Sequence, residues 1–298
     1  MKLLVTGANG QVGYELVRSL MPLGEVVALT RGDCDLTRPE AIARAIGAHK
    51  PDVIVNAAAY TAVDRAESEE DLATRINGEA PRALALAARS VGALLLHYST
   101  DYVFDGDKDT PWDETDPVSP LNAYGRSKLA GERAIMASGA DFIILRTTWV
   151  FAARGANFVR TMLRLGRERE TLKVVADQFG APTWARNIAD ASAHVVMAVQ
   201  RERAEGRFAS EVLHLASQGQ TSWHGFATEI YAEFGRQRPG AVLRVRAVEP
   251  IPSSEYPTSA RRPANSRLDC SRLASRFGIR LPPWRDALAR CLEEIGEN

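Results

Sequence analysis

The sequence has few cysteines, no excess charge of either sign and no long apolar run. Its cysteines, Cys34, Cys270 and Cys291, are too few and too far apart for a disulfide framework and indicate a reducing cytoplasm. No segment approaches the roughly 18 to 20 apolar residues that span a bilayer, and the N-terminus turns early into Thr6-Gly7, which predicts a first strand rather than a signal peptide. The 37 basic residues balance the 37 acidic ones, so the expected partner is a small molecule, with no nucleic acid and no membrane surface.

Short apolar runs alternate with helical segments through the first half of the chain. The expected strands cover residues 2–6, 26–30, 53–56, 94–98 and 142–145, and the expected helices cover residues 12–20, 39–46, 67–89 and 124–136. Apolar runs without polar alternation are typical of parallel strands that are covered on both faces. The order therefore predicts an α/β fold, a Rossmann-type doubly wound parallel sheet with a smaller C-terminal α/β substrate lobe.

The expected domains follow from where this rhythm weakens, after residue 148. The nucleotide-binding core should comprise residues 1–148, joined by residues 183–216. Residues 149–182 and 217–298 should form the substrate-binding lobe. The proline-containing stretch 105–121 is long for a loop in a compact domain, which indicates a functional surface loop.

A glycine-rich loop follows the first expected strand and precedes the first expected helix. Gly7, Gly10 and Gly13 lack side chains, so the backbone can turn sharply and approach a pyrophosphate, whose charge the exposed N–H groups and the helix dipole would meet. Gln11 and Val12 lie within the same loop. The third expected strand ends in a second set of small residues that would line the cofactor, Ala57, Ala58 and Ala59, with Thr61 close behind.

The end of the second expected strand bears on which nicotinamide cofactor binds. An acidic residue there would hold the ribose 2′-hydroxyl, whereas Arg31 could pair with a 2′-phosphate, which favours NADPH. A solvated arginine is an equally good interpretation, and Asp33 or Asp35 could still serve NADH. Asp35 and Leu36 are expected along the adenine.

Thr100, Tyr124 and Lys128 form the candidate catalytic set. Tyr124 lies four residues before Lys128, so both side chains share one face of a helix. Thr100 ends a parallel strand, where hydroxyl groups point into the ligand crevice and could hold a carbonyl oxygen. A nearby lysine and a positively charged nicotinamide would lower the pKa of the tyrosine towards the working range. These residues predict hydride reduction with Tyr124 as the proton donor.

Several further segments resemble the dTDP-4-dehydrorhamnose reductases, a family of extended short-chain dehydrogenases. The resemblance is carried nearly end to end by residues 10–13, 51–59, 61–64, 97–104, 119–122, 146–150, 180–183 and 262–266. It implies reduction of a sugar nucleotide to dTDP-β-L-rhamnose. It also implies that Thr100, Tyr124 and Lys128 are catalytic, that residues 10–12, 35–36 and 59–61 touch the cofactor, and that Thr100, Asp101 and Trp149 touch the substrate. Tyr102 and Asn265 are further substrate-side candidates of the same motifs.

The resemblance also raises magnesium and a homodimer. Members of this family can bind Mg²⁺ through acidic side chains at a dimer contact, and Glu15 matches one such position. Arg186 stands where another carboxylate would be expected, so no metal site is predicted and the homodimer stays open. The histidines show no metal-ligand spacing and are interpreted as structural: His49, His97, His194, His214 and His224.

Three other functions share this fold. A 4,6-dehydratase needs a glutamate as base after Thr100-Asp101, and this sequence has Tyr102 there. A 4-epimerase needs only the tyrosine, the lysine and a tightly held cofactor. A regulatory subunit of methionine adenosyltransferase resembles the same family and can keep both residues without catalysis. Trp149 favours the reductase, because a large aromatic face can pack a deoxysugar, although a core tryptophan is the alternative.

Overall fold

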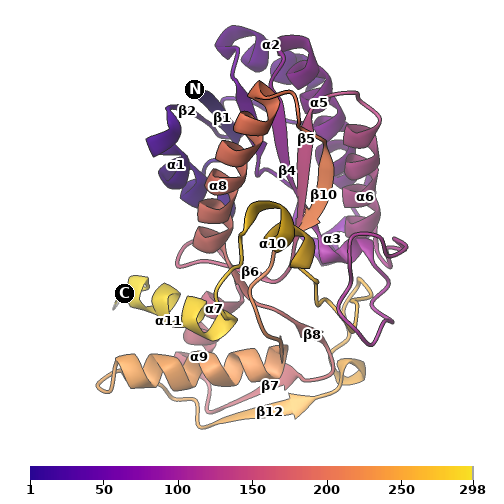
Figure 1. Cartoon of the computed structure of the whole chain (residues 1–298). Coiled ribbons are helices and arrows are strands. Elements are labelled where there is room, and N and C mark those ends of the chain that lie inside the picture. The colour runs from indigo at the N-terminus through magenta and orange to yellow at the C-terminus, as the bar shows by residue number, and fades with distance from the viewer. Residues whose placement is uncertain (297–298) are drawn as a thin grey trace.

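The computed structural model describes residues 1–296. Its centre is a six-stranded, entirely parallel sheet in the order β10-β5-β4-β3-β1-β2 (Figure 1). The strands are β1 (Lys2–Thr6), β2 (Glu25–Leu29), β3 (Val53–Asn56), β4 (Leu94–Thr100), β5 (Phe142–Thr147) and β10 (Glu211–His214). This arrangement confirms the predicted Rossmann-type doubly wound fold.

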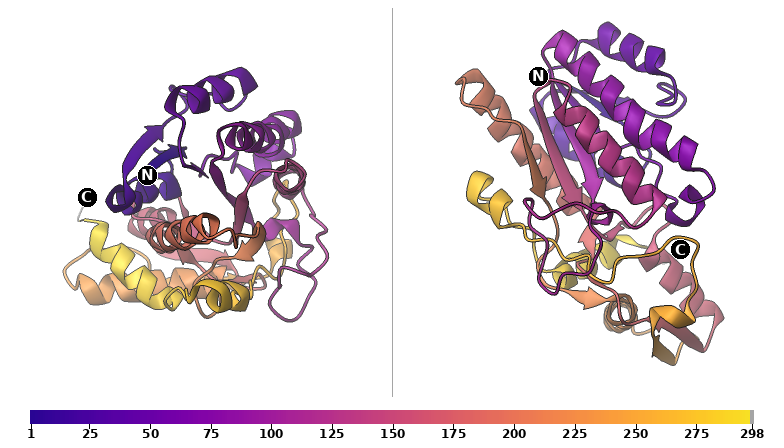
Figure 2. Two further views of the ribbon diagram at one scale, coloured as in Figure 1. Left: turned by 45° about the horizontal axis from the view of Figure 1, so that its top comes forward. Right: turned by 90° about the vertical axis from the view of Figure 1, so that its right-hand side faces the viewer.

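Helices cover both faces of the sheet, which is why the strands are apolar throughout. On one face lie α1 (Gln11–Leu20) and α8 (Ala185–Ala204), and on the other lie α2 (Pro39–His49), α5 (Ala80–Val91) and α6 (Ala123–Met136) (Figures 1 and 2). Alternate residues of β1 enter different cores: Leu3 and Val5 pack with α1 and α8, whereas Leu4 packs with α2, α5 and α6. Odd and even positions of each strand therefore face different sets of helices.

The chain reverses its direction across the sheet between β1 and β3. From β1 it passes to β2 at the edge and then crosses back, so β1 has β2 on one side and β3 on the other. A crevice opens at such a switch point, beyond the carboxyl ends of the strands. The approach is close here: Gly7 has φ +68°, and a Cβ atom on it would lie 2.8 Å from the Ala58 backbone.

The long helix expected over residues 67–89 is interrupted. It begins as α4 (Glu70–Thr74), passes through a π-helical turn (Arg75–Glu79) and continues as α5. At this turn α6 comes so near that a Cβ on Gly131 would lie 2.1 Å from the Asn77 carbonyl oxygen. Asn77 donates to Ser127 of α6 at 3.0 Å, so tertiary packing shapes the turn.

The smaller C-terminal lobe lies below the carboxyl edge of the sheet in Figure 1. It has a hydrophobic core of its own, which joins α7 (Phe158–Glu168), α9 (Trp223–Gln237) and α11 (Trp284–Glu294) with β7 (Thr171–Val175). β7 pairs in parallel with β12 (Ala247–Ile251). The remaining elements are α3 (Val63–Ala66), α10 (Ser271–Phe277), β6 (Val150–Phe151), β8 (Phe179–Gly180), β9 (Thr183–Trp184), β11 (Thr221–Ser222) and the 3₁₀ turns at Met21–Leu23, Asp101–Val103 and Ser253–Glu255.

One element departs from the expected division of the chain. Residues 217–298 were expected in the lobe, yet Leu273 of α10 and Leu281 pack into the core on the α1 and α8 side of the sheet. Phe277 of α10 packs against the same core, so α10 helps to cover the sheet beside β10. In the part of the chain that the structure describes, no helix combines the length and apolar character needed to cross a membrane.

Candidate active site

A cavity of about 540 Å³ opens at the switch point between β1 and β3. Its walls come from the glycine loop after β1, the loop after β2, the alanines after β3 and one face of α6. Thirteen of the fourteen expected cofactor residues line it, namely Gly7, Gly10, Gln11, Val12, Arg31, Asp35, Leu36, Ala57, Ala58, Ala59, Thr61, Tyr124 and Lys128. Segments far apart in the sequence therefore meet around one nucleotide-sized space.

Gly13 is the exception, and packing explains its residue type. It lies in α1 behind the loop, where a Cβ atom would lie 2.0 Å from the Gly7 carbonyl oxygen. The absence of a side chain at Gly13 therefore lets the backbone of α1 contact the glycine loop directly. No acidic side chain occupies the first turn of α1, so its N-terminal N–H groups and dipole are available to an anion such as a pyrophosphate.

The loop after β2 separates its charged side chains. Asp33 accepts hydrogen bonds from the Thr30 amide and hydroxyl at 2.9 and 2.7 Å, and Asp35 accepts from the Thr37 amide and hydroxyl at 3.0 and 2.9 Å. These bonds lower the pKa of both carboxyl groups and fix them in local turns. Arg31 is exposed at the pocket wall, whereas both aspartates are held by neighbouring threonines. Arg31 is therefore better placed than Asp33 or Asp35 to bind a group on the adenosine ribose.

The expected catalytic residues converge at the carboxyl end of β4. Thr100 is buried; its hydroxyl donates to Asp101 Oδ1 at 3.1 Å and accepts from the Tyr102 amide at 3.2 Å. Tyr124, in the first turn of α6, interacts with the Thr100 side chain. Lys128 lies one turn later and is buried, with Nζ donating to the Tyr98 carbonyl oxygen at 2.6 Å. Tyr124 and Lys128 thus line the nucleotide cavity, and Thr100 lies buried behind them in contact with Tyr124.

The ionisation of these groups differs in part from the expectation. The protein around the half-buried Tyr124 raises the pKa of its phenol, and the hydrogen bond with Thr100 offsets only part of that effect. Burial lowers the pKa of Lys128 to about 8, while the carboxylate of Glu132 acts in the opposite direction. The phenol therefore keeps its proton, the form that a proton donor needs. The sequence suggested that Lys128 would lower this pKa, but Lys128 is not among the groups that shift it.

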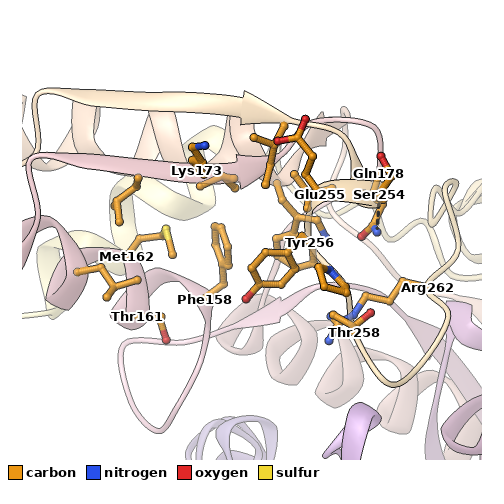
Figure 3. A pocket seen from close by; sticks show the side chains of 18 of the residues that line it. Phe158, Thr161, Met162, Lys173, Gln178, Ser254, Glu255, Tyr256, Thr258 and Arg262 are labelled. Atoms are coloured by element: carbon orange, nitrogen blue, oxygen red, sulfur yellow. Dashed lines mark hydrogen bonds between the residues drawn. The ribbon is translucent and has the colours of Figure 1, made fainter.

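A larger cavity of about 1310 Å³ lies in the lobe, between α7, β7 and the segment 251–262. Figure 3 shows the Phe158 and Tyr256 rings facing the same space, with Met162 beside Phe158 and Lys173 across from them. Its cationic lining residues are Arg169, Lys173, Arg261 and Arg262. Aromatic faces with cations at the margin suit a base and a diphosphate.

The segment 251–262 is fastened at both ends. The Ser253 amide and hydroxyl donate to Asp177, and Arg262 donates to Asp64 at 2.8 Å. Asp64 lies in α3, just after the loop that carries Thr61 of the nucleotide pocket. The wall of the large cavity is therefore tied to the cofactor side of the molecule.

Trp149 stands between the two cavities but lines neither wall. It is one of two non-glycine residues with positive φ among residues 1–296, at +46°. Its ring stacks on Trp223, a lining residue of the large cavity, with centroids 3.6 Å apart and an interplanar angle of 10°. A Cβ on Gly180 would lie 2.6 Å from the same ring. The strained backbone is held by this packing.

Asn265 differs from its expected substrate role. Its Nδ2 donates to the carbonyl oxygens of Lys108 and Thr110 at 2.6 and 2.8 Å, and its Oδ1 accepts from the amide and Nε of Arg267. An asparagine amide has two N–H groups and two acceptor positions, so its capacity is used. Asn265 fastens the loop 105–121 and has no hydrogen-bonding capacity left for a ligand.

Tyr102 has a packing role beside the expected catalytic residue Tyr124. Its ring meets that of Tyr124 edge to face, with centroids 5.5 Å apart. Burial raises its pKa to about 12, while Arg262 acts in the opposite direction. Tyr102 therefore links the end of β4 to the segment that borders the large cavity.

The sequence analysis did not single out several of the residues that line the two cavities. Ser99, Thr147 and Ile76 line the nucleotide cavity, and the Ser99 hydroxyl is buried without a hydrogen-bond partner. The large cavity depends on Phe158, Thr161 and Tyr256, whose segments carry no motif. Hydroxyl residues at the ends of neighbouring parallel strands were the only available hint for Ser99 and Thr147.

The residues around Glu15 do not fit magnesium. Glu15 is buried, and its Oε2 accepts from Arg18 Nε at 3.2 Å and from Arg186 Nε at 2.9 Å. Arg186 also pairs with Glu294 of α11. Guanidinium groups occupy the positions from which a cation would be bound, and residues 1–296 contain no cluster of three or more acidic, histidine or cysteine ligands.

We therefore expect chelation to leave the protein unchanged. Dialysis against EDTA should shift neither the unfolding midpoint nor the turnover rate, because Arg186 supplies the positive charge beside Glu15. Calorimetry and an activity assay before and after addition of Mg²⁺ would measure this. A clear gain in either quantity with Mg²⁺ would contradict the assignment.

Fold and pocket together define an α/β enzyme of the NAD(P)-dependent short-chain dehydrogenase class. Residues 1–297 match the family described as RmlD substrate binding domain. The dTDP-4-dehydrorhamnose reductase of Burkholderia thailandensis is 60% identical over 296 residues, 99% of each chain, and that of Escherichia coli K12 is 45% identical over 300 residues, 99% of this chain and 98% of the other. The chain belongs to the dTDP-4-dehydrorhamnose reductase family.

Solved structures agree with this membership. The dTDP-4-dehydrorhamnose reductase of Bacillus anthracis in complex with NADP superposes with a TM-score of 0.87 at 34% identity, covering 98% of this chain and 99% of that one. The UDP-glucose 4-epimerase of Thermus thermophilus reaches 0.78 at 18% identity, covering all of both chains, and shares the fold.

Proposed function

We propose that this protein catalyses the NADPH-dependent reduction of the C4 keto group of dTDP-4-dehydro-β-L-rhamnose to dTDP-β-L-rhamnose. The proposal rests on Tyr124 and Lys128 at the wall of the nucleotide cavity, with the buried Thr100 in contact with Tyr124. Relatives that match this chain over nearly their whole length bear the name of this reductase. The same activity would complete the synthesis of dTDP-rhamnose.

The chemistry requires one hydride and one proton. NADPH, held by the glycine loop and by Arg31, would supply the hydride when bound. Thr100 would orient the carbonyl oxygen, and Tyr124 would donate its proton to that oxygen as negative charge develops. The raised pKa of Tyr124 keeps this proton in place until the reaction. Lys128 would then restore the proton of Tyr124.

We assign the sugar nucleotide to the large cavity of the lobe, which comprises residues 149–182 and 217–296 without the segment 271–281. Phe158 and Tyr256 offer faces for the base, and Arg262 with the neighbouring cations suits the diphosphate. Asp101 and the Trp149–Trp223 stack would then border the sugar. Burial raises the pKa of Asp101 to about 6, so this carboxyl group changes charge near neutral pH.

Particular residues argue against two of the three alternative functions. A dehydratase lacks its base, because Tyr102 follows Asp101 and packs on Tyr124. A non-catalytic subunit has no need for the buried Lys128 beside a protonated Tyr124. Epimerases retain the same pair, so turnover must separate that function.

The deciding experiment follows NADPH absorbance when the purified protein meets dTDP-4-dehydro-L-rhamnose, with the product identified by chromatography. Stoichiometric formation of dTDP-rhamnose and NADP⁺ supports the reductase. Conversion of the substrate without net cofactor oxidation would indicate an epimerase. Cofactor binding without any turnover would indicate the regulatory subunit.

Cofactor choice gives a sharper prediction at Arg31. We expect Arg31→Asp to raise KM for NADPH by at least tenfold and to lower KM for NADH, because the new carboxylate repels a 2′-phosphate and can accept from a 2′-hydroxyl. Steady-state kinetics with both cofactors measure the change. Arg38→Asp, on the exposed N-terminal side of α2, is the matched control. Equal effects of both variants would assign the change to net charge.

Two wider parts of the proposal concern location and assembly. Cys34, Cys270 and Cys291 are free thiols, which suits the cytoplasm. Because Arg18 and Arg186 bind Glu15, a metal ion cannot bridge two subunits at that residue. A homodimer would therefore need a different interface. Sedimentation would measure the state of assembly.

A further inference from the structure

A row of polar side chains crosses the sheet beneath the active site. Thr6 of β1 is in register with Asn56 of β3, and Asn56 is in register with His97 of β4. All three are buried and point to the α6 side of the sheet, where the preceding alternate residues are apolar. The next group along the row is Lys128 of α6. The sequence predicted only a structural histidine here.

The row is continuous in hydrogen bonds. The Thr6 hydroxyl donates to Asn56 Oδ1 at 2.6 Å, which directs the amide nitrogen of Asn56 towards His97. That nitrogen lies 2.9 Å from His97 Nδ1, and His97 Nε2 lies 3.2 Å from Lys128 Nζ. An amide N–H can only donate, so His97 Nδ1 must accept.

This polarity fixes the imidazole tautomer. Burial and the adjacent lysine lower the pKa of His97 well below its ordinary value, so the ring is neutral and carries one proton. With Nδ1 accepting, that proton is on Nε2 and faces Lys128. An ammonium group would meet it donor to donor, whereas a neutral amine accepts it through its lone pair.

We propose that His97 is a positioning residue which, oriented by Asn56 and Thr6, offers its Nε2–H to Lys128 and favours the neutral amine of the lysine. This rests on the reductase activity proposed above. Lys128 keeps one hydrogen bond to the Tyr98 carbonyl oxygen in either form. A lysine that has both forms available near neutral pH can return a proton to Tyr124 and be recharged at low cost.

The surrounding ionisable groups do not replace this effect. Glu132, one turn after Lys128, favours the ammonium form but accepts hydrogen bonds from Nε and Nη2 of Arg146 at 2.9 and 2.7 Å. Burial nevertheless lowers the pKa of Lys128 to about 8, and the Nε2–H of His97 acts in the same direction as burial. The other ionisable groups on the elements around the row are Tyr124, Arg126, Glu132 and Arg133 of α6, Tyr98 of β4, Asp101 after β4, Arg146 of β5, and Arg31, Cys34, Asp35 and Tyr60 at the pocket wall.

The first test reads the tautomer directly and needs no turnover. Long-range ¹H–¹⁵N spectra of the full chain, with the His97 signals identified by their loss in His97→Gln, should show Nε2 protonated at pH 7. In Asn56→Asp the new carboxylate accepts from Nδ1–H, so the tautomer should reverse. A wild-type ring protonated on Nδ1 would overturn the proposal, whatever the activity.

The second test follows kcat against pH. Wild-type turnover should fall as pH rises through about 8, where Lys128 loses its proton. His97→Gln can turn its amide oxygen to the ammonium group, so the alkaline limb should move up by about one unit, with KM for NADPH changed less than twofold. Asn56→Asp should move it in the same direction.

His214→Gln is the matched control, because His214 is equally buried but faces the Trp112 carbonyl oxygen. His214→Gln should leave the alkaline limb of the pH profile of kcat unchanged. If folded His97→Gln also leaves that limb unchanged, the proposal is overturned, even if Asn56→Asp fails to fold. An Nε2-protonated His97 in a protein without turnover would instead refute the reductase and leave the tautomer assignment standing.

Discussion

Replacement of Tyr124 by phenylalanine should lower kcat by about 10²- to 10⁴-fold, the usual contribution of a positioned proton donor. The phenol lies at the pocket wall beside Thr100, and its raised pKa holds the proton needed at the substrate oxygen. Phenylalanine keeps the ring and its edge-to-face contact with Tyr102. The loss should therefore appear in kcat, with little change in NADPH affinity. Absorbance kinetics and a fluorescence titration would separate the two.

Tyr231→Phe provides the matched control for that result. Tyr231 also has a partly buried phenol, which donates to the Met162 carbonyl oxygen away from the nucleotide cavity. Its removal should change kcat by less than threefold. If Tyr124→Phe retained more than a tenth of wild-type kcat, another group would have to donate the proton.

Replacement of Arg146 by methionine should destabilise the protein by about 3–5 kcal/mol, because it leaves the buried Glu132 carboxylate without its partner. Arg146 lies in β5 and Glu132 in α6, and their side chains are 6% and 0% exposed. Such a loss is a large part of the total stability of an ordinary protein, about 5–15 kcal/mol. Denaturant unfolding followed by circular dichroism would measure it.

A double replacement separates the pair from its parts. Arg146→Met together with Glu132→Leu removes both charges and should recover most of the lost stability. Arg164→Met breaks an exposed pair with Glu168 in α7 and should cost less than about 1 kcal/mol. A single Arg146→Met variant as stable as the wild type would mean that water or a proton neutralises Glu132.

The strands and the nucleotide loop were predictable because their signals are local. A parallel strand covered on both faces is apolar along its length, so the predicted bounds of β1 and β3 match the observed ones. β4 and β5 begin at the predicted residues and each extends two residues further than predicted. Gly7 and Gly10 were identifiable because a strand, a turn and a helix follow one another within a few residues. The spacing of Tyr124 and Lys128 likewise needs only one helix.

Other features depend on contacts between distant segments, which leave no periodic trace. The π-helical turn at Asn77 arises where α6 packs against it. The four residues of β10 form a strand because they pair with β5, which is distant in the sequence. Asn265 stands in a family motif, yet only the loop 105–121 shows that its amide is saturated. The departure of α10 from the lobe has the same origin.

The sequence by itself determined the parallel sheet, the glycine loop and the paired tyrosine and lysine, because strand burial and helical spacing act over a few residues. The tertiary structure decided what surrounds them. It placed Thr6, Asn56 and His97 in one buried row against Lys128, and it brought Arg186 into a hydrogen bond with the buried Glu15. Register across strands and desolvation in a packed interior set those environments, and neither is written in any single segment of the chain.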